Sequence, residues 1–161
     1  MPPQDAILVL EAPLGSALYA QALALREAVL RRPLRLTLGE EELEDDKLRT
    51  HFCAVQHGAV LGCVSLKPLE GSSLQLKQMA VAENRRLEGI GAALVAHAEA
   101  WARGRGIGEM VLHARIGAED FYAKQGYRAE GSIFDENTIP HIKMTKLLSE
   151  RTSPHDLGGQ L

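Results

Sequence analysis

Apolar residues recur along the chain with two different spacings, and the change from one spacing to the other marks the boundaries of the predicted elements. Short alternating or continuous apolar runs predict strands over residues 6–10, 52–55, 60–66, 74–81, 110–113, 127–134 and 141–146. Apolar positions three and four residues apart predict helices over residues 16–32, 89–103 and 118–124. Hairpins near both ends, with strands and helices alternating between them, predict a mixed α/β sheet with flanking helices.

The first predicted helix is followed by charged residues. Ser16 is suited to cap its N-terminus, and its apolar face ends near Arg32. We interpret Arg31, Arg32 and Arg35 as a solvated helix end. The acidic block over residues 40–46 is interpreted as a mobile, solvated loop or short helix, because like charges in a row repel one another.

Length and charge restrict the classes of protein that fit. With 161 residues the chain is long enough for one substantial core, so we expect a single domain over residues 1–148 and a disordered polar tail over residues 149–161. The net charge of −3 argues against a broad basic face for nucleic acid. No apolar run approaches the roughly 20 residues that span a membrane, and the start lacks the features of a signal peptide. We therefore expect a cytoplasmic protein with no membrane partner.

Cysteine and histidine patterns argue against a metal site. Cys53 and Cys63 lie on the two arms of a predicted hairpin, and two cysteines alone do not make a disulfide framework, so we interpret them as buried thiols. The six histidines are scattered through the sequence without an H-x-x-x-H pair, and there is no C-x-x-C pair. We expect no metal cofactor.

The junction between a strand and the helix over residues 89–103 carries the strongest chemical signal. Gly89 and Gly91 lie where the helix begins, and Arg85 and Arg86 precede them. The first turn of a helix has unpaired N–H groups and about half a positive charge, and glycine lets an anion approach that backbone. The pattern predicts a phosphate-binding site. The alternative is that the two glycines only permit close packing of helix on sheet.

Two common phosphate-binding motifs do not match this junction. Leu94 occupies the position of the third small residue of the dinucleotide fingerprint, and Gly91 is not followed by the Lys and Ser/Thr of a nucleotide loop. The segment Arg86-Leu87-Glu88-Gly89-Ile90-Gly91 instead resembles the Arg/Gln-x-x-Gly-x-Gly/Ala loop of the GCN5-related N-acetyltransferase (GNAT) superfamily. In that superfamily the loop binds the pyrophosphate of acetyl-coenzyme A (acetyl-CoA).

Further segments resemble the same superfamily. Residues 121–127, Phe-Tyr-Ala-Lys-Gln-Gly-Tyr, are similar to its aromatic pair followed by Gly-Tyr or Gly-Phe. Residues 134–136 and 139–144 resemble the closing hairpin of the bacterial ElaA-like group. The resemblance covers residues 6–147 in outline. It implies the GNAT fold, with a mixed, mostly antiparallel central sheet, flanking helices and a splayed central strand pair, one strand of which carries a bulge.

The resemblance also implies a place for each part of acetyl-CoA. The N–H groups of residues 87–92 would bind the diphosphate. The backbone of residues 79–81 would pair with the pantetheine arm and stabilise the developing oxyanion. Tyr122 would protonate the departing thiolate. The residues expected to bind the cosubstrate are Met79, Ala80, Val81, Arg86, Leu87, Glu88, Gly89, Ile90, Gly91, Ala92 and Phe121.

The acceptor must lose a proton, because an amine with a pKa near 10.4 is almost wholly protonated at neutral pH. Glu136, His141 and His113 could face the acceptor, and a chain of waters could serve in their place. We assign Glu136 and His141 to the catalytic site together with Tyr122. Arg26 resembles an arginine of the ElaA-like group that faces the acceptor cleft, and the alternative is a solvated or ion-paired helix residue.

These resemblances predict an acetyl-CoA-dependent N-acetyltransferase that acetylates a primary amine of a small molecule or peptide, and they leave a homodimer open. Cys53 and Cys63 are far in sequence from the end of the motif strand, which argues for direct transfer without an acetyl-enzyme. The acidic block over residues 40–46 could attract cationic acceptors such as polyamines or lysine-bearing peptides. The alternative function is a non-catalytic sensor or interaction module that binds coenzyme A with the same fold.

Overall fold

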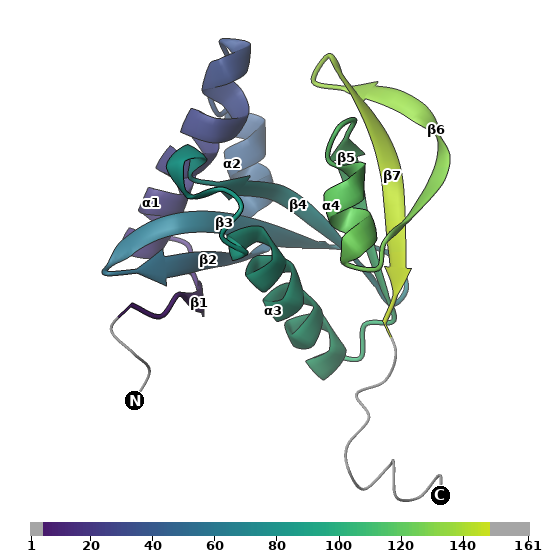
Figure 1. Ribbon diagram of the computed structural model, residues 1–161, viewed down its shortest axis with the longest axis horizontal. Coiled ribbons are helices and arrows are strands. Elements are labelled where there is room, and N and C mark those ends of the chain that lie inside the picture. Colours follow the sequence, from purple (N-terminus) through teal and green to yellow (C-terminus); the bar gives the residue numbers. More distant parts are fainter. Residues whose placement is uncertain (1–4, 149–161) are drawn as a thin grey trace, which may run out of the picture.

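A computed structural model describes residues 5–148 and consists of one seven-stranded sheet with helices on both faces (Figure 1). The strand order is β1-β2-β3-β4-β5-β7-β6, and of these neighbouring pairs β4–β5 is parallel and the others are antiparallel. This confirms the predicted mixed, mostly antiparallel sheet. The predicted tail over residues 149–161 lies outside the described residues. The strands are β1 (Leu8–Glu11), β2 (Thr50–Gln56), β3 (Ala59–Pro68), β4 (Ser73–Val81), β5 (Glu109–Arg115), β6 (Arg128–Glu136) and β7 (Ile139–Leu147).

The helices form where they were predicted, except that the first one changes type before it ends. Ser16 caps α1 by accepting a hydrogen bond from the Tyr19 N–H. After α1 the chain continues as one π-helical turn and one 3-10 turn, in which Pro33 has no N–H to donate. In residues 5–148 no helix is both long enough and apolar enough to cross a membrane. The helices are α1 (Ala17–Arg26), η1 (Glu27–Arg31), η2 (Arg32–Leu34), α2 (Glu40–Asp46), η3 (Glu83–Arg85), α3 (Ile90–Gly104) and α4 (Glu119–Lys124).

The core has one part on each face of the sheet, because alternate residues of a strand point in opposite directions. Helices α1 and α3 lie on opposite sides of strands β2 to β4 (Figure 1). Cys53 and Cys63 are free, buried thiols on the α1 face, as predicted. The α3 face buries Phe52, Ala54, Val64, Leu66, Ile90 and Leu94, and the α1 face buries Ala12, Ala22, Cys53, Cys63 and Ala80.

Strands β4 and β5 separate halfway along their length, which confirms the predicted splayed pair. They are paired only from Ser73 opposite Glu109 to Leu76 opposite Leu112. Beyond this point Val81 is still paired with β3, whereas β5 continues beside β7. The two central strands therefore form a V that opens toward their C-terminal ends.

A β-bulge lies in β4 where the splay begins. Ser65 pairs with Lys77 and Cys63 with Ala80, so β4 contains one more residue than β3 over this stretch. Gln78 adopts a left-handed backbone conformation with φ 56°. The extra residue reverses the side-chain alternation of the strand. Leu74 and Leu76 point to the α3 face before the bulge, and Met79 and Val81 point to it afterwards.

Candidate active site

The predicted phosphate loop is a sharp turn that leads from η3 into α3. Gly89 is the N-cap of α3 with φ 83°, and it provides no side-chain cap for the first turn. Leu87 also has a positive φ of 68°, and its side chain is fully exposed. The first N–H groups of α3 have no partner within the helix and point out of its N-terminus. The loop therefore presents a row of backbone donors at the positive end of a helix dipole.

The two arginines beside this loop have different surroundings. Arg85 donates to Glu88 at 2.8 Å and to the side chain of Gln56 at 2.7 Å, so it holds the loop in shape. Arg86 is exposed, and within residues 5–148 it has no ion-pair partner. Arg86 is thus the free cation of the predicted pair.

Gly89 and Gly91 serve different purposes. A Cβ atom on Gly91 would lie 3.1 Å from Cζ of Phe121, so this glycine lets the aromatic ring pack against the first turn of α3. A Cβ atom on Gly89 would meet no other atom within 4 Å, and a positive φ is what this position requires. Close packing explains Gly91, whereas Gly89 shapes an open surface in front of the helix.

A cavity of about 370 Å³ occupies the opening between β4 and β5. Met79, Ala114 and Tyr122 line it together with polar residues from the α1 and α2 face of the sheet. Residues from the α3 face and from the α2 face of the sheet thus both line the cavity. The polar lining residues are Arg31, Glu42, Asp45, Arg49, Gln75, Lys77, Gln78, His113, Arg115, Tyr122, Glu136, Asn137 and His141.

Tyr122 lies at this cavity with its hydroxyl free. No hydrogen bond joins that hydroxyl to another of the described residues, and burial raises the pKa of Tyr122 to about 12. The group stays protonated at neutral pH and can donate a hydrogen bond or a proton. Tyr127 differs, because it is buried and its hydroxyl donates to Glu99 at 3.0 Å, which makes it a core residue.

Glu136, His141 and His113 come together at the cavity, although they were predicted from separate segments. Nδ1 of His113 lies 3.0 Å from Glu136 Oε1, and Nε2 of His141 lies 3.6 Å from Glu136 Oε2. Nδ1 of His141 contacts the Ile139 carbonyl oxygen at 2.7 Å, so it carries a proton. A carboxylate accepts from a ring N–H, which puts the proton of neutral His113 on Nδ1 and leaves its Nε2 lone pair free.

Arg26 is buried and ion-paired, which decides between the two expectations for this residue. Its Nη1 lies 2.6 Å from Oδ2 of Asp46, and the two side chains are 3% and 0% exposed. Tyr19 also donates to Asp46, and Arg49 approaches its other oxygen at 3.4 Å. Asp46 therefore joins α1, α2 and the start of β2. Arg26 does not line the cavity.

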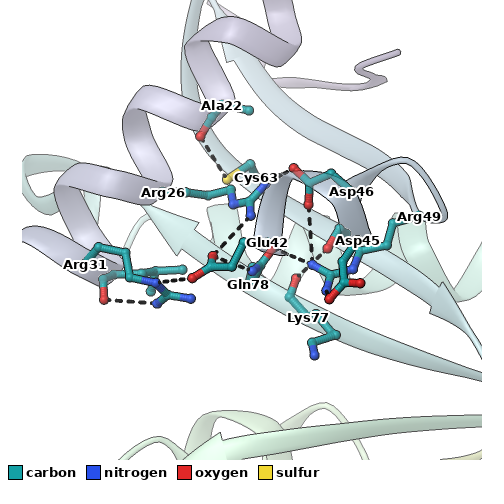
Figure 2. A network of polar contacts seen from close by, with 12 residues as sticks. Ala22, Arg26, Arg31, Glu42, Asp45, Asp46, Arg49, Cys63, Lys77 and Gln78 are labelled. Carbon is teal, nitrogen blue, oxygen red and sulfur yellow. Dashed lines mark hydrogen bonds and ion pairs between the residues drawn. The ribbon is translucent and has the colours of Figure 1, made fainter. Parts of the chain in front are cut away.

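A second group of polar contacts lies between the contacts of Asp46 and the bulge in β4 (Figure 2). Arg31 donates to Glu42 at 2.8 Å. The Gln78 side chain donates to Glu42 at 3.1 Å and accepts from Arg49 at 2.8 Å. Gln78, the residue at the bulge, is thus held by hydrogen bonds to a carboxylate and to a guanidinium group. We call Arg26, Arg31, Glu42, Asp45, Asp46, Arg49 and Gln78 the arginine–carboxylate cluster.

The cluster corrects two predictions. Arg31 is buried, so the interpretation of Arg31, Arg32 and Arg35 as a solvated helix end holds only for the last two. The acidic block over residues 40–46 is the short helix α2, but Asp46 in it is fully buried. Arg31 and Asp46 can be buried because each forms an ion pair with a side chain of opposite charge.

Several residues that line the cavity were not predicted from the sequence. Arg49, Lys77 and Arg115 belong to segments that were interpreted only as strands or their flanks. A signal for the bulge was present, because the large apolar residues in β4 stand at even positions through Leu76 and at odd positions from Met79. This change of alternation is typical of a one-residue insertion.

Comparisons with known proteins agree with this geometry. The sequence model of the family described as "Acetyltransferase (GNAT) family" matches residues 14–127. A Bacillus subtilis (strain 168) protein named "Putative acetyltransferase" is 28% identical over 128 residues, which are 78% of this chain and 86% of that protein. A crystal structure of a "putative N-acetyltransferase" from Lactobacillus plantarum has a TM-score of 0.81 and 25% identity, covering 90% of this chain and all 100% of the other. An aminoglycoside 6'-N-acetyltransferase complexed with coenzyme A shares the fold, with a TM-score of 0.74, 20% identity and coverage of 91% and 99%.

Proposed function

Because the chain belongs to the acetyltransferase (GNAT) family, we propose that it transfers the acetyl group of acetyl-CoA directly to a primary amine of a small molecule or peptide. The observation that carries the proposal is the cavity at the splay of β4 and β5. A Cβ atom on Gly91 would lie 3.1 Å from Phe121 and 3.8 Å from Met79. Met79 and Tyr122 both line the cavity, which supports a place for the phosphate loop beside the opening.

The proposed cosubstrate fits the elements around the opening. The N–H groups of residues 87–92 would hold the diphosphate, with Arg86 beside them. Glu88 is engaged with Arg85 and would bind through its backbone rather than its carboxylate. The backbone of residues 79–81, freed from β5 by the splay, would pair with the pantetheine amides and donate to the developing charge on the thioester oxygen.

The protein groups at the cavity can handle both protons of the reaction. Tyr122 is the proposed donor to the coenzyme A sulfur. Nε2 of His113 is the proposed acceptor of the amine proton, with Glu136 holding the ring through its contact with Nδ1. Nε2 of His141 lies 3.6 Å from the other oxygen of Glu136, and this contact is an ion pair only when both ring nitrogens of His141 carry a proton. This arrangement offers a candidate base, which supports an enzyme rather than a sensor module.

Amine-dependent release of free thiol tests the proposal. The protein is incubated with acetyl-CoA and a panel of primary amines, thiol is followed continuously, and products are identified by mass spectrometry. We expect thiol release only with an amine, and an acetylated amine as the product. Binding of coenzyme A without turnover on any amine would overturn the enzyme proposal and favour the sensor. Mass spectrometry of the intact protein in mid-reaction should find no acetyl-enzyme, since transfer is direct.

Other features stay predictions. These are the single domain over residues 1–148, the relationship to the ElaA-like group, the cytoplasmic location and the open homodimer.

A further inference from the structure

The charges around the cavity do not cancel, and the surplus is positive. In the arginine–carboxylate cluster, three arginines face three carboxylates. The third carboxylate is that of Asp45, which lies 3.5 Å from Arg49. Glu42 and Asp45, the carboxylates of α2 that line the cavity, are therefore both paired with arginines of this cluster.

Two cationic side chains that line the cavity do not belong to the arginine–carboxylate cluster. Lys77 lies on β4 just before the bulge, and Figure 2 shows its side chain directed away from the cluster. Arg115 lies at the end of β5 and donates to the carbonyl oxygen of Leu30 at 3.3 Å. Among residues 5–148, neither has a carboxylate within ion-pair distance. Burial lowers the pKa of Lys77 and of Arg115, because each charge has lost water and the nearby Glu136 carboxylate offsets this loss only in part.

The one remaining carboxylate at the cavity is Glu136, and it is engaged with His113 and His141. The cavity thus contains two kinds of polar group. A carboxylate and two histidines can deal with an amine, and two cations without an ion-pair partner can bind an anion; one of these cations, Arg115, lies opposite His141 on β7. A ligand that satisfies both kinds of group carries an amine and an anion in one molecule.

We propose that the acceptor amine also carries a carboxylate, and that Lys77 and Arg115 bind this carboxylate. The inference rests on the proposed acetyl transfer and names its substrate class. It excludes polyamines as preferred acceptors, because they would place a second ammonium group against Lys77 and Arg115. The carboxylate of the acceptor would supply the counter-charge that these two side chains lack in the protein.

A matched set of amines tests this class. Phenylalanine, phenylalaninamide and phenethylamine share the side chain and the amine but differ in the carboxylate, and lysine with cadaverine forms a second pair. We expect kcat/KM to be at least about tenfold higher for the two amino acids than for their amidated or decarboxylated counterparts. Equal values within both sets would overturn the inference while leaving the acetyltransferase proposal intact. Absence of turnover on every amine would overturn the proposed function itself.

Variants of Lys77 and Arg115 test whether these two side chains cause the preference for a carboxylate. Lys77→Met and Arg115→Gln should each reduce the preference for the carboxylate by about tenfold, and Lys77→Arg should retain it. Lys77→Glu should favour cadaverine over lysine. Lys143→Met is the control, because Lys143 lies opposite His113 on β7 without lining the cavity, and its preference should equal that of the wild type.

The affinity for coenzyme A separates local effects from misfolding. The Lys77 and Arg115 variants should bind coenzyme A as the wild type does, measured by calorimetry. A variant that loses the carboxylate preference together with this affinity would indicate that Lys77 or Arg115 serves the cosubstrate, and would overturn the assignment.

Discussion

The two faces of the sheet hold the two halves of the site by different means. On the α3 face, the phosphate loop uses backbone N–H groups of consecutive residues, and Gly89 keeps the space before them open. On the α1 and α2 face, the acceptor side is made of charged side chains from η1, α2, β4 and β5, which neutralise one another in part. A backbone site depends on local conformation, whereas a side-chain site depends on the whole fold. Substitutions on the two faces should therefore differ in their effects on stability and on coenzyme A binding.

Removal of the Asp46 charge should have the largest effect, and on stability rather than on coenzyme A binding. Asp46→Asn leaves the buried guanidinium groups of Arg26 and Arg49 without their shared partner. Breaking a buried ion pair costs about 3–5 kcal/mol. Urea unfolding should show this loss, while Glu44→Gln, which removes only the exposed pair with Lys47, should cost less than about 1 kcal/mol. Similar losses for both variants would contradict the role given to the cluster.

Gly89→Glu should weaken coenzyme A binding strongly without comparable loss of stability. The new carboxylate would occupy the open space at the start of α3 and repel the diphosphate, at a cost of about 3 kcal/mol or about 100-fold in Kd. Gly89→Ala separates the backbone strain at φ 83° from charge and bulk, and Gly104→Glu adds the same charge at the other end of α3. Calorimetric titration should find near-wild-type affinity for Gly104→Glu. An unchanged Kd for Gly89→Glu would remove the loop from the site.

Tyr122→Phe should reduce kcat by about 100-fold and leave the Kd of coenzyme A unchanged, because the hydroxyl is proposed to act only as the proton donor. Since the pKa of Tyr122 is raised to about 12, the donor stays protonated up to alkaline pH. The wild-type rate should not fall between pH 8 and about 10 through loss of this proton. Tyr127→Phe is the matched control, and it should lower stability through the lost bond to Glu99 more than it lowers kcat. A full rate in Tyr122→Phe would refute the assignment.

The smallest expected effect is that of Gln78→Ala, at the point where the two faces meet. Both residues have a Cβ and bear similar strain at a positive φ, so the change isolates the two hydrogen bonds to Glu42 and Arg49. We expect a loss of about 1–2 kcal/mol in the free energy of unfolding. Gln78→Gly loses the same bonds but relieves the strain, so its loss should be smaller. Unchanged stability of Gln78→Ala would mean that the side chain does not stabilise the bulge.

The difference between the faces also explains how much the sequence could reveal. Gly89, Gly91 and Phe121 lie in short segments whose conformation depends on neighbours in sequence, and these were recognisable as motifs. The positions of the strands followed from the apolar periodicity for the same reason. Arg31 was misread because its partner, Glu42, lies eleven residues away on another helix. No local pattern indicates that two runs of opposite charge will be buried together, since this depends on how α1 and α2 pack on the sheet.

The cavity is bordered by two places where the chain holds one residue more than regular geometry requires. One is the π-helical turn η1, which supplies Leu30 and Arg31, and the other is the bulge at Gln78. Gain or loss of a single residue at either place would reshape the acceptor cavity while the sheet order and the phosphate loop persist. Related proteins could therefore diverge in the amines they accept through small insertions and deletions. The coenzyme A side would be inherited unchanged.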